Sequence, residues 1–137
     1  MFSYHTHIYL HDTDLTGVIY FPNQLRLALE AFENFSRPKG CNIKTLIDEG
    51  YLIPVVHAEA DYMAPLEMGD EIEISIWLDK MGTSSFTLCF SYYNQTKQIL
   101  AGTAKITHVF IRHTTKRSTP IPEEFRSILA SLIKVGA

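Results

Sequence analysis

The segment from Asp12 to Asn23 combines residue types that could do chemistry at a carbonyl group. It reads Asp-Thr-Asp-Leu-Thr-Gly-Val-Ile-Tyr-Phe-Pro-Asn. Gly17 permits a tight turn, and Pro22 suits the first turn of a helix, where its missing N–H would have no partner. Helix N-termini present unpaired N–H groups and a partial positive charge, which can polarise a carbonyl and stabilise an oxyanion. A carboxylate just upstream, such as Asp14, could then act as nucleophile or general base.

The same segment also fits roles without catalysis. An Asp-x-Asp-x-x-Gly run is ordinary turn chemistry, in which carboxylates and hydroxyls bond to nearby backbone groups. Calcium loops begin similarly, but an EF-hand loop needs Glu at its twelfth position, and counted from Asp12 that position is Asn23. The residues alone therefore exclude an EF-hand loop and leave a reaction site and a plain loop as alternatives.

A strand and a long helix must position this segment. Residues 3–10 are rich in β-branched and aromatic side chains, which predicts a strand. A helical pattern opens at Pro22 and should stop near residues 37–40. Its apolar face is predicted to hold Leu25, Leu29, Phe32 and Phe35.

Further along, the period of the apolar residues changes from helical to alternating. A short helix is predicted from the cap Asn42 through Asp48 or Glu49, with Gly50 as its stop. Residues after Pro120 and Pro122 predict a C-terminal amphipathic helix. Between these helices, strands are predicted at residues 54–64, 70–80, 84–95 and 98–113, at spacings that suit antiparallel hairpins.

This element order predicts an α+β fold in which an antiparallel sheet curves around the long helix. The whole chain, residues 1–137, forms one domain at this length. A single sheet leaves one face or edge uncovered, and dimerisation is the expected remedy if that surface is apolar.

Composition narrows the class further. The chain has 46 % apolar and 20 % charged residues, which excludes a disordered protein, and no apolar run is long enough to cross a membrane. The net charge of −3 argues against a nucleic-acid partner. Two cysteines form no disulfide framework or zinc spacing, and no signal peptide is evident, so a cytoplasmic location is expected.

Charge is unevenly distributed along the chain. Residues 1–96 carry five Lys or Arg against thirteen Asp or Glu, whereas residues 97–137 carry seven against two. This late basic segment could face an anionic ligand or form a solvated strand and tail.

Two stretches resemble the 4-hydroxybenzoyl-CoA thioesterase family of hotdog-fold proteins. The first is residues 11–35 with the motif described above, and the second is residues 53–70, which begins Ile-Pro-Val-Val-His-Ala-Glu-Ala-Asp-Tyr. The resemblance covers almost the whole chain. It implies a hotdog fold, a five-stranded antiparallel sheet wrapped around a central helix. It also implies a homo-oligomer, a dimer or a homotetramer, with active sites at the dimer interface.

The resemblance also implies roles for individual residues of the motif. Asp14 corresponds to the catalytic carboxylate, and the backbone N–H of Phe21 to the oxyanion donor. Gly17 shapes the turn between them. Asp12 is expected to stabilise the loop. These assignments agree with the chemistry that the residues themselves suggest at the start of the helix.

Three further residues are expected to contact the substrate. Tyr20 could line the acyl pocket or pack in the core. Glu30 enters because some branches of the family carry the catalytic carboxylate on the central helix; otherwise it is an exposed helical residue. His57 stands on a predicted strand as a possible pocket residue, while His108 and His113 are assigned no chemistry.

Coenzyme A carries phosphates that need cations. One branch of the family has a basic run before its fourth strand, but this chain offers only Lys80 there. The remaining candidates are Arg112, Lys116 and Arg117 at the end of the last strand, where a solvated tail is the alternative.

The resemblance therefore implies an acyl-CoA thioesterase that forms a free acid and coenzyme A. Its sequence is most similar to aryl-CoA members that act on 1,4-dihydroxy-2-naphthoyl-CoA. Short-chain acyl-CoA and acyl-carrier-protein thioesterases share the motif, and hotdog dehydratases or a non-catalytic acyl-CoA-binding protein are alternatives of other classes. No metal or tightly bound cofactor is expected, because no ligand cluster is present.

Overall fold

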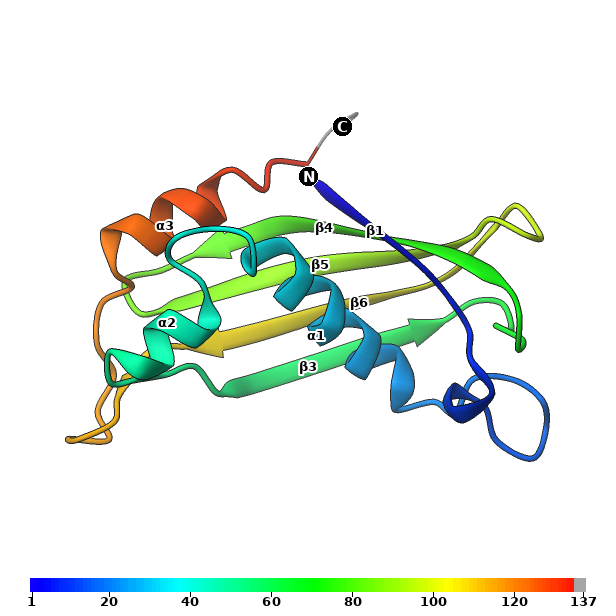
Figure 1. The fold of residues 1–137 in the computed structure, drawn as a ribbon, viewed down its shortest axis with the longest axis horizontal. Coiled ribbons are helices and arrows are strands. Elements are labelled where there is room, and N and C mark those ends of the chain that lie inside the picture. Colours follow the sequence, from blue (N-terminus) through cyan, green and yellow to red (C-terminus); the bar gives the residue numbers. More distant parts are fainter. Residues whose placement is uncertain (135–137) are drawn as a thin grey trace.

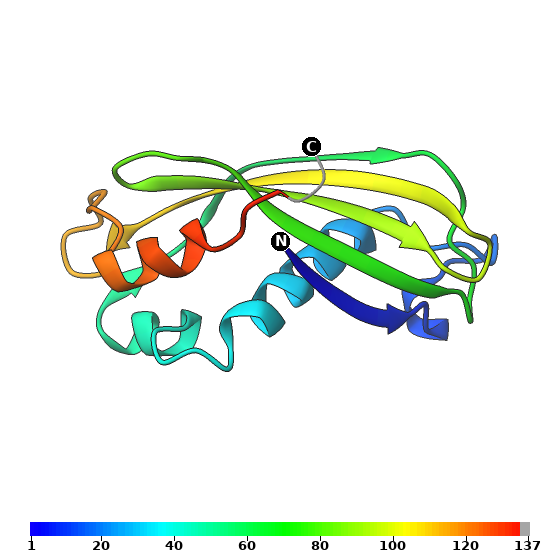
Figure 2. The same ribbon diagram turned by 90° about the horizontal axis from the view of Figure 1, so that it is seen from above.

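The computed structural model describes residues 1–134, in which an antiparallel sheet curves around one long helix (Figures 1 and 2). The elements in chain order are β1 (Phe2–His7), η1 (Leu10–Asp12), α1 (Asn23–Ser36), α2 (Ile43–Asp48), β2 (Tyr51–Leu52), β3 (Val55–Tyr62), β4 (Glu71–Met81), β5 (Ser85–Asn94), β6 (Ile99–Val109), β7 (Ile111–Arg112) and α3 (Glu123–Ala130).

The main sheet has the strand order β1-β4-β5-β6-β3, and every neighbouring pair is antiparallel. β4, β5 and β6 follow one another as hairpins, while β1 and β3 form the two edges. The predicted five-stranded sheet around a central helix is therefore confirmed. The predicted strand 98–113 is divided, because the chain leaves the sheet at Phe110 and β7 pairs instead with β2.

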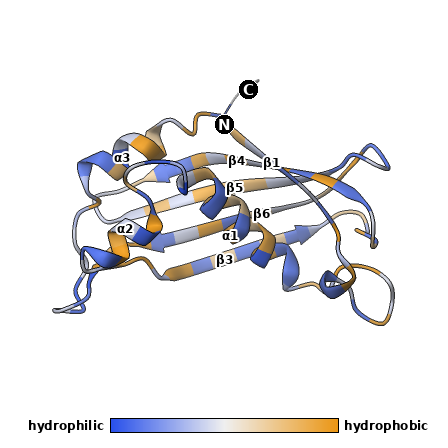
Figure 3. Ribbon diagram, viewed as in Figure 1, coloured by the Kyte–Doolittle hydropathy of each residue, from blue (hydrophilic) through white to orange (hydrophobic). Residues whose placement is uncertain are grey.

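The core lies between α1 and the concave face of the sheet. Alternate residues of each central strand face the helix, so bands of hydrophobic and hydrophilic residues alternate along the ribbon (Figure 3). Fully buried inward-facing residues include Ile72, Ile74 and Ile76 of β4 and Leu88, Phe90 and Tyr92 of β5. Removal of this apolar surface from water is the main stabilisation of the fold.

The helix α1 presents a different face to the sheet than its leucine spacing predicts. Leu27, Ala28 and Ala31 are buried, whereas Leu29 is 40 % exposed and Leu25 is only partly buried. The small side chains of the two alanines allow the helix to approach the sheet closely. The prediction that Leu29 belongs to the buried face is therefore wrong, and Leu29 instead lies at the wall of a pocket described below.

The two shorter helices match their predicted caps. The Asn42 side chain accepts a hydrogen bond from the Thr45 N–H at 3.0 Å, and Thr45 Oγ1 accepts one from the Asn42 N–H at 2.9 Å. Gly50 follows α2 with a φ of +95°, the left-handed conformation that ends helices. α3 begins after Pro122 and buries Phe125 and Leu129. Within residues 1–134, no helix combines the length and apolarity needed to span a membrane.

Candidate active site

Residues 13–19 form a tight hairpin loop that carries Asp14 and leads into the start of α1. A bridge joins Thr13 to Ile19, and the Asp14 N–H donates to the Val18 carbonyl at 3.1 Å. Gly17 has a φ of +84° and donates its N–H to the Asp14 carbonyl at 3.1 Å. This backbone conformation explains the glycine, because other residues adopt it only with strain. Asp14 itself is exposed.

The Asp14 carboxylate is held in its charged form by the loop. The N–H and the hydroxyl of Thr16 both donate to Asp14 Oδ1, the N–H at 2.7 Å. These hydrogen bonds lower the pKa of Asp14 below its usual value, because they stabilise the carboxylate. Oδ2 accepts no hydrogen bond from any residue that the structure describes. Asp14 therefore offers an ionised oxygen that can act as a nucleophile or a general base.

Asp12 is buried and connects the loop to the helix. Its Oδ2 accepts the Tyr9 N–H at 2.8 Å, and its Oδ1 pairs with the guanidinium of Arg26 on α1. Its backbone carbonyl accepts from the Tyr20 N–H and from the Asn23 side-chain amide, each at 2.9 Å. With both oxygens occupied, Asp12 has the loop-stabilising role that the sequence suggested.

The backbone N–H of Phe21 is the available donor at the start of α1. The N–H groups of the next residues are already hydrogen-bonded within the chain. Asn23 donates to the Tyr20 carbonyl at 2.9 Å, and Gln24 donates to the Phe21 carbonyl at 3.4 Å. Pro22 has no N–H. The Phe21 N–H has no hydrogen-bond partner within residues 1–134, and Phe21 is 62 % exposed. It can therefore polarise a carbonyl, with the helix dipole adding to the effect.

A set of residues that sequence reasoning missed fixes the position of this donor. Tyr62 at the end of β3 donates its hydroxyl to the Phe21 carbonyl at 2.6 Å. The buried Gln24 donates its amide to the carbonyls of Asp61 at 2.9 Å and Thr103 at 3.1 Å. These bonds tie the first turn of α1 to the sheet. Only the folded chain brings such distant residues together, so the local pattern held no signal for them.

Two sheet residues complete this anchor. The hydroxyl of the buried Tyr92 donates to the Gln24 carbonyl. A Cβ added at Gly102 would lie 2.5 Å from the Asp61 carbonyl and 2.6 Å from the Gln24 amide nitrogen. Gly102 is therefore the position where helix and sheet come too close for any side chain.

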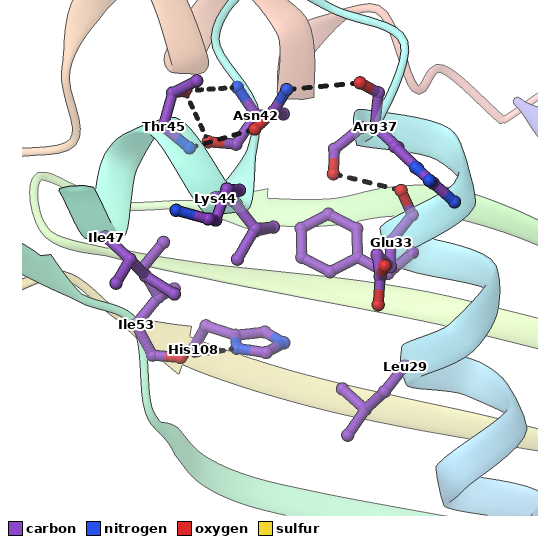
Figure 4. A pocket seen from close by; sticks show the side chains of 12 residues that line it. Leu29, Glu33, Arg37, Asn42, Lys44, Thr45, Ile47, Ile53 and His108 are labelled. Carbon is purple, nitrogen blue, oxygen red and sulfur yellow. Dashed lines mark hydrogen bonds between the residues drawn. The ribbon is translucent and has the colours of Figure 1, made fainter.

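A second region of interest lies at the opposite end of α1. A pocket of about 790 Å³ opens between the second half of α1, the helix α2 and Ile53, which lies two residues before β3 (Figure 4). Its volume falls in the range of small-molecule sites. Polar residues Glu33, Arg37 and Lys44 also line it. The apolar part of its wall consists of Leu29, Phe32, Ile43, Ile47 and Ile53.

His108 lines this pocket, although the sequence analysis assigned it no chemistry. It is 5 % exposed, and its Nδ1 lies 3.3 Å from the Ile53 carbonyl. Its ring stacks on Phe86, with centroids 5.0 Å apart and planes at 13°. Burial lowers the pKa of His108, so the ring is neutral at pH 7. The alternation of β6, in which Ala104, Ile106 and His108 share the inward face, was the signal that could have found it.

The other predicted substrate-binding residues of the first half of the chain are not gathered at the Asp14 carboxylate. Tyr20 is 49 % exposed and its ring lies against that of Phe21. Glu30 accepts the Tyr4 hydroxyl at 2.6 Å. Burial and this carboxylate raise the pKa of Tyr4 to about 12. His57 is exposed on the edge strand β3, with its Nε2 3.5 Å from Glu59.

The basic candidates gather in the turn that follows β7. The Arg112 guanidinium lies 4.2 Å from the centre of the Tyr51 ring and donates to the Glu49 carbonyl at 3.2 Å. Lys116 lies in the turn with its Nζ 3.3 Å from His113, and Arg117 is exposed. This turn stands at the α2 end of the molecule, away from the 13–19 loop (Figure 1).

Comparison with known proteins identifies the family of this chain. Residues 8–129 match the thioesterase-like superfamily. The chain belongs to this superfamily, and it is a hotdog-fold thioesterase, a hydrolase of CoA thioesters.

Named relatives narrow the comparison. The chain is 34 % identical over 126 residues to the 1,4-dihydroxy-2-naphthoyl-CoA hydrolase of Microcystis aeruginosa, covering 91 % of this chain and 90 % of that one. The crystal structure of a 1,4-dihydroxy-2-naphthoyl-CoA thioesterase from Synechocystis aligns with a TM-score of 0.89 at 26 % identity, covering 96 % of each chain. A gentisyl-coenzyme A thioesterase aligns with a TM-score of 0.80 at 26 % identity, covering 90 % of this chain and 98 % of that one.

Proposed function

We propose that this thioesterase hydrolyses the CoA thioesters of hydroxylated aromatic acids, with 1,4-dihydroxy-2-naphthoyl-CoA as its substrate. The observations that carry the proposal are the ionised Asp14, in the loop that leads into α1, and the free Phe21 N–H at the start of that helix. The acyl group is inferred from the relatives, because the 1,4-dihydroxy-2-naphthoyl and gentisyl groups in their names both carry hydroxyls on an aromatic ring.

The reaction needs no group beyond these residues and water. The Phe21 N–H binds the thioester carbonyl oxygen and stabilises the negative charge that develops on it. Asp14 either attacks the carbonyl carbon to form an anhydride, which water then hydrolyses, or removes a proton from the attacking water. In both routes the C–S bond breaks, and the sulfur leaves as the thiolate and takes up a proton. Neither route uses a metal or a bound cofactor.

A homodimer is the proposed assembly, and its interface is the edge strand β3. Seven of the eight residues of β3 are exposed, including Val55 at 43 %, Val56 at 58 % and Tyr62 at 49 %. An open edge strand is a template for pairing with a second chain, and such pairing would bury the exposed Val55, Val56 and Tyr62. A twofold axis that continues the sheet requires the two β3 strands to run antiparallel. Further pairing into a tetramer is a prediction that a mass measurement in solution tests.

This pairing explains why the loop and the pocket lie at opposite ends of one protomer. Antiparallel β3 strands place the Tyr62 end of one protomer beside the Val55 end of the other. Tyr62 holds Phe21, and Ile53 at the pocket wall comes two residues before Val55. The Asp14 loop of one protomer therefore faces the pocket of the second. The turn with Lys116 and Arg117 lies at the pocket end of that second protomer and can bind the CoA phosphates.

We also assign the activity to the cytoplasm. The free thiols of Cys41 and Cys89 suit a reducing compartment. Measurement of the activity in separated cell fractions tests this location.

The test is release of coenzyme A, followed with a thiol-reactive dye. The panel contains benzoyl, 1,4-dihydroxy-2-naphthoyl, short-chain and long-chain acyl-CoA, with Asp14→Asn beside the wild type. We expect the dihydroxynaphthoyl thioester to be preferred and kcat/KM to fall about a thousandfold or more in Asp14→Asn. Asp79→Asn, the same change at an exposed ion pair on the outer face of the sheet, should leave the rate unchanged.

Other outcomes lead to named alternatives. Preference for a short chain would replace the aryl assignment. No turnover by folded protein that still binds coenzyme A would indicate a carrier-protein thioester or a binding protein. Full activity of Asp14→Asn would reject the mechanism and direct attention to Glu30. Single turnover in isotope-labelled water tests the anhydride route, because label enters the Asp14 carboxylate only if an anhydride forms and water attacks its Asp14 carbonyl carbon.

A further inference from the structure

The protonation state of His108 follows from its surroundings. The Ile53 carbonyl can only accept a hydrogen bond, so the His108 Nδ1 that lies 3.3 Å from it must carry the proton. In the neutral ring, Nε2 then carries a lone pair and acts as an acceptor. This Nε2 is buried and has no hydrogen-bond partner within residues 1–134. A buried acceptor without a donor is destabilising, and its presence calls for a physical explanation.

The position of the ring supplies one. Figure 4 shows the His108 ring extending into the pocket toward Leu29. Next to the ring the surroundings are aromatic: the pocket residue Phe32 lies 5.6 Å from the His108 ring centre, and the buried Phe86 stacks on the ring at 5.0 Å. Leu29 and Ile47 are 40 % and 51 % exposed, so these wall residues are free to repack around a ligand. A flat aromatic ligand fits such a wall. The His108 Nε2 is the acceptor that β6 directs toward it.

The acyl groups named for the relatives share a chemical unit. The 1,4-dihydroxy-2-naphthoyl group is a gentisyl, or 2,5-dihydroxybenzoyl, group with a second ring fused to it. In both, one hydroxyl is adjacent to the carbonyl and can donate to the thioester oxygen within the ligand. The other hydroxyl lies across the ring and cannot reach it. Once buried, that distal hydroxyl needs an acceptor from the protein.

An acyl group bound at Phe21 can contact His108 only if His108 belongs to the second protomer. Phe21 and Leu29 are eight residues apart, or about 12 Å along the helix axis, so a bicyclic acyl group at Phe21 does not reach His108 of the same chain. In the proposed dimer, Phe21 of one protomer faces the pocket of the other. The distal hydroxyl then points toward the pocket that contains His108.

We infer that His108 is the specificity-determining residue of this thioesterase, and that its Nε2 accepts a hydrogen bond from the distal hydroxyl of a 2,5-dihydroxyaroyl group bound to the second protomer. This inference rests on the proposed function and adds to it the residue that recognises the acyl group. A site built to bond a hydroxyl discriminates strongly against the analogue that lacks it, because the acceptor is left unpaired.

The test compares two substrates that differ only in this hydroxyl. These are 1,4-dihydroxy-2-naphthoyl-CoA and 1-hydroxy-2-naphthoyl-CoA. The wild type should prefer the first by about tenfold to a hundredfold in kcat/KM. His108→Asn keeps an amide at the position of Nδ1 for the Ile53 carbonyl but has no atom at the position of Nε2. It should hydrolyse both substrates at similar rates, with the 1-hydroxy rate within a few-fold of wild type.

Two further variants separate recognition from folding. His108→Gln places an amide oxygen near the position of Nε2 and should restore part of the preference. His5→Asn is the matched control: it replaces an exposed histidine of β1 by asparagine, as in His108→Asn, and should leave the substrate preference intact. Thermal unfolding of each variant confirms that it is folded.

Each remaining result overturns the inference. A wild type without preference, a His108→Asn variant that keeps it, or an equal loss on both substrates would show that His108 only supports the fold. Failure of the proposed function looks different, because the wild type would then hydrolyse neither thioester.

Discussion

At each end of α1 the surroundings lower the pKa of one side chain, but the lowered pKa favours opposite charge states. At the 13–19 loop, hydrogen bonds from Thr16 lower the pKa of the exposed Asp14 and favour its charged form. At the pocket, burial lowers the pKa of His108 and favours its neutral form. The first end is charged and solvated and is the proposed reaction centre, whereas the second is desolvated and is the proposed recognition surface. This chain separates the two regions along one helix, and in the proposed dimer a second copy brings them together.

The largest expected effect comes from mixing protomers that each lack one of the two residues. Co-expression of Asp14→Asn chains with His108→Asn chains, each carrying a different affinity tag, yields mixed dimers. If each site takes Asp14 from one protomer and His108 from the other, every mixed dimer has one intact site. On 1,4-dihydroxy-2-naphthoyl-CoA it should regain about half the wild-type rate, several hundredfold above Asp14→Asn alone.

Sites contained within one protomer predict another result for the same experiment. The mixed dimer would then show no native preference for the dihydroxy substrate, because no site would hold both residues. Mixed dimers of wild-type and Asp14→Asn chains, prepared in the same way, serve as the reference for one intact site.

A substitution at Gly102 should damage the reaction centre through the anchor of α1. In Gly102→Ala the new Cβ would lie 2.6 Å from the amide nitrogen of Gln24 on α1, as well as 2.5 Å from the Asp61 carbonyl of β3, so the start of the helix must shift. We expect the free energy of unfolding to fall by about 1–3 kcal/mol and kcat to fall with it. Urea unfolding and CoA release measure the two effects. Gly40→Ala, where the nearest atom would be 3.9 Å away, is the control; an equal loss there would reject the anchor.

The buried His108 should make stability depend on pH. Its pKa is below the ordinary value of 6.5 in the folded state, so the unfolded chain binds a proton that the folded chain does not. Stability is therefore fully present above about pH 6.5 and is lost as the pH falls below it. Between pH 7 and pH 5, His108→Asn should lose about 1 kcal/mol less than wild type. Urea midpoints at both pH values measure this difference, and His5→Asn should behave as wild type.

The smallest expected effect concerns the hydrogen bond to Asp14. Thr16→Val removes the hydroxyl but keeps the backbone N–H, so the pKa of Asp14 should rise toward its usual value. The acid limb of the profile of kcat/KM against pH should move to higher pH, while the plateau changes only a few-fold. Thr13→Val removes a hydroxyl that donates to the Leu10 carbonyl instead and should leave the limb in place.

Local patterns in the sequence predicted much of the fold and the local geometry of the 13–19 loop and of the helix start. The turn chemistry around Gly17 and the helix start at Pro22 depend on neighbours within a few residues, so they are visible in the chain itself. The strand alternation predicted the sheet for the same reason. The apolar face of α1 was predicted less well, because Leu25 and Leu29 follow a helical spacing while packing selected the smaller Ala28 and Ala31.

Only the tertiary structure decided the role of residues whose partners are far away in the chain. His108 became a pocket residue because β6, α1, α2 and Ile53 meet around it. Tyr62 and Gln24 became anchors of the oxyanion donor through bonds that span 41 and 37 residues. Local turn chemistry and hydrophobic periodicity are encoded by neighbours along the sequence. Burial, and the unpaired acceptor it creates at His108, exist only after distant segments have packed together.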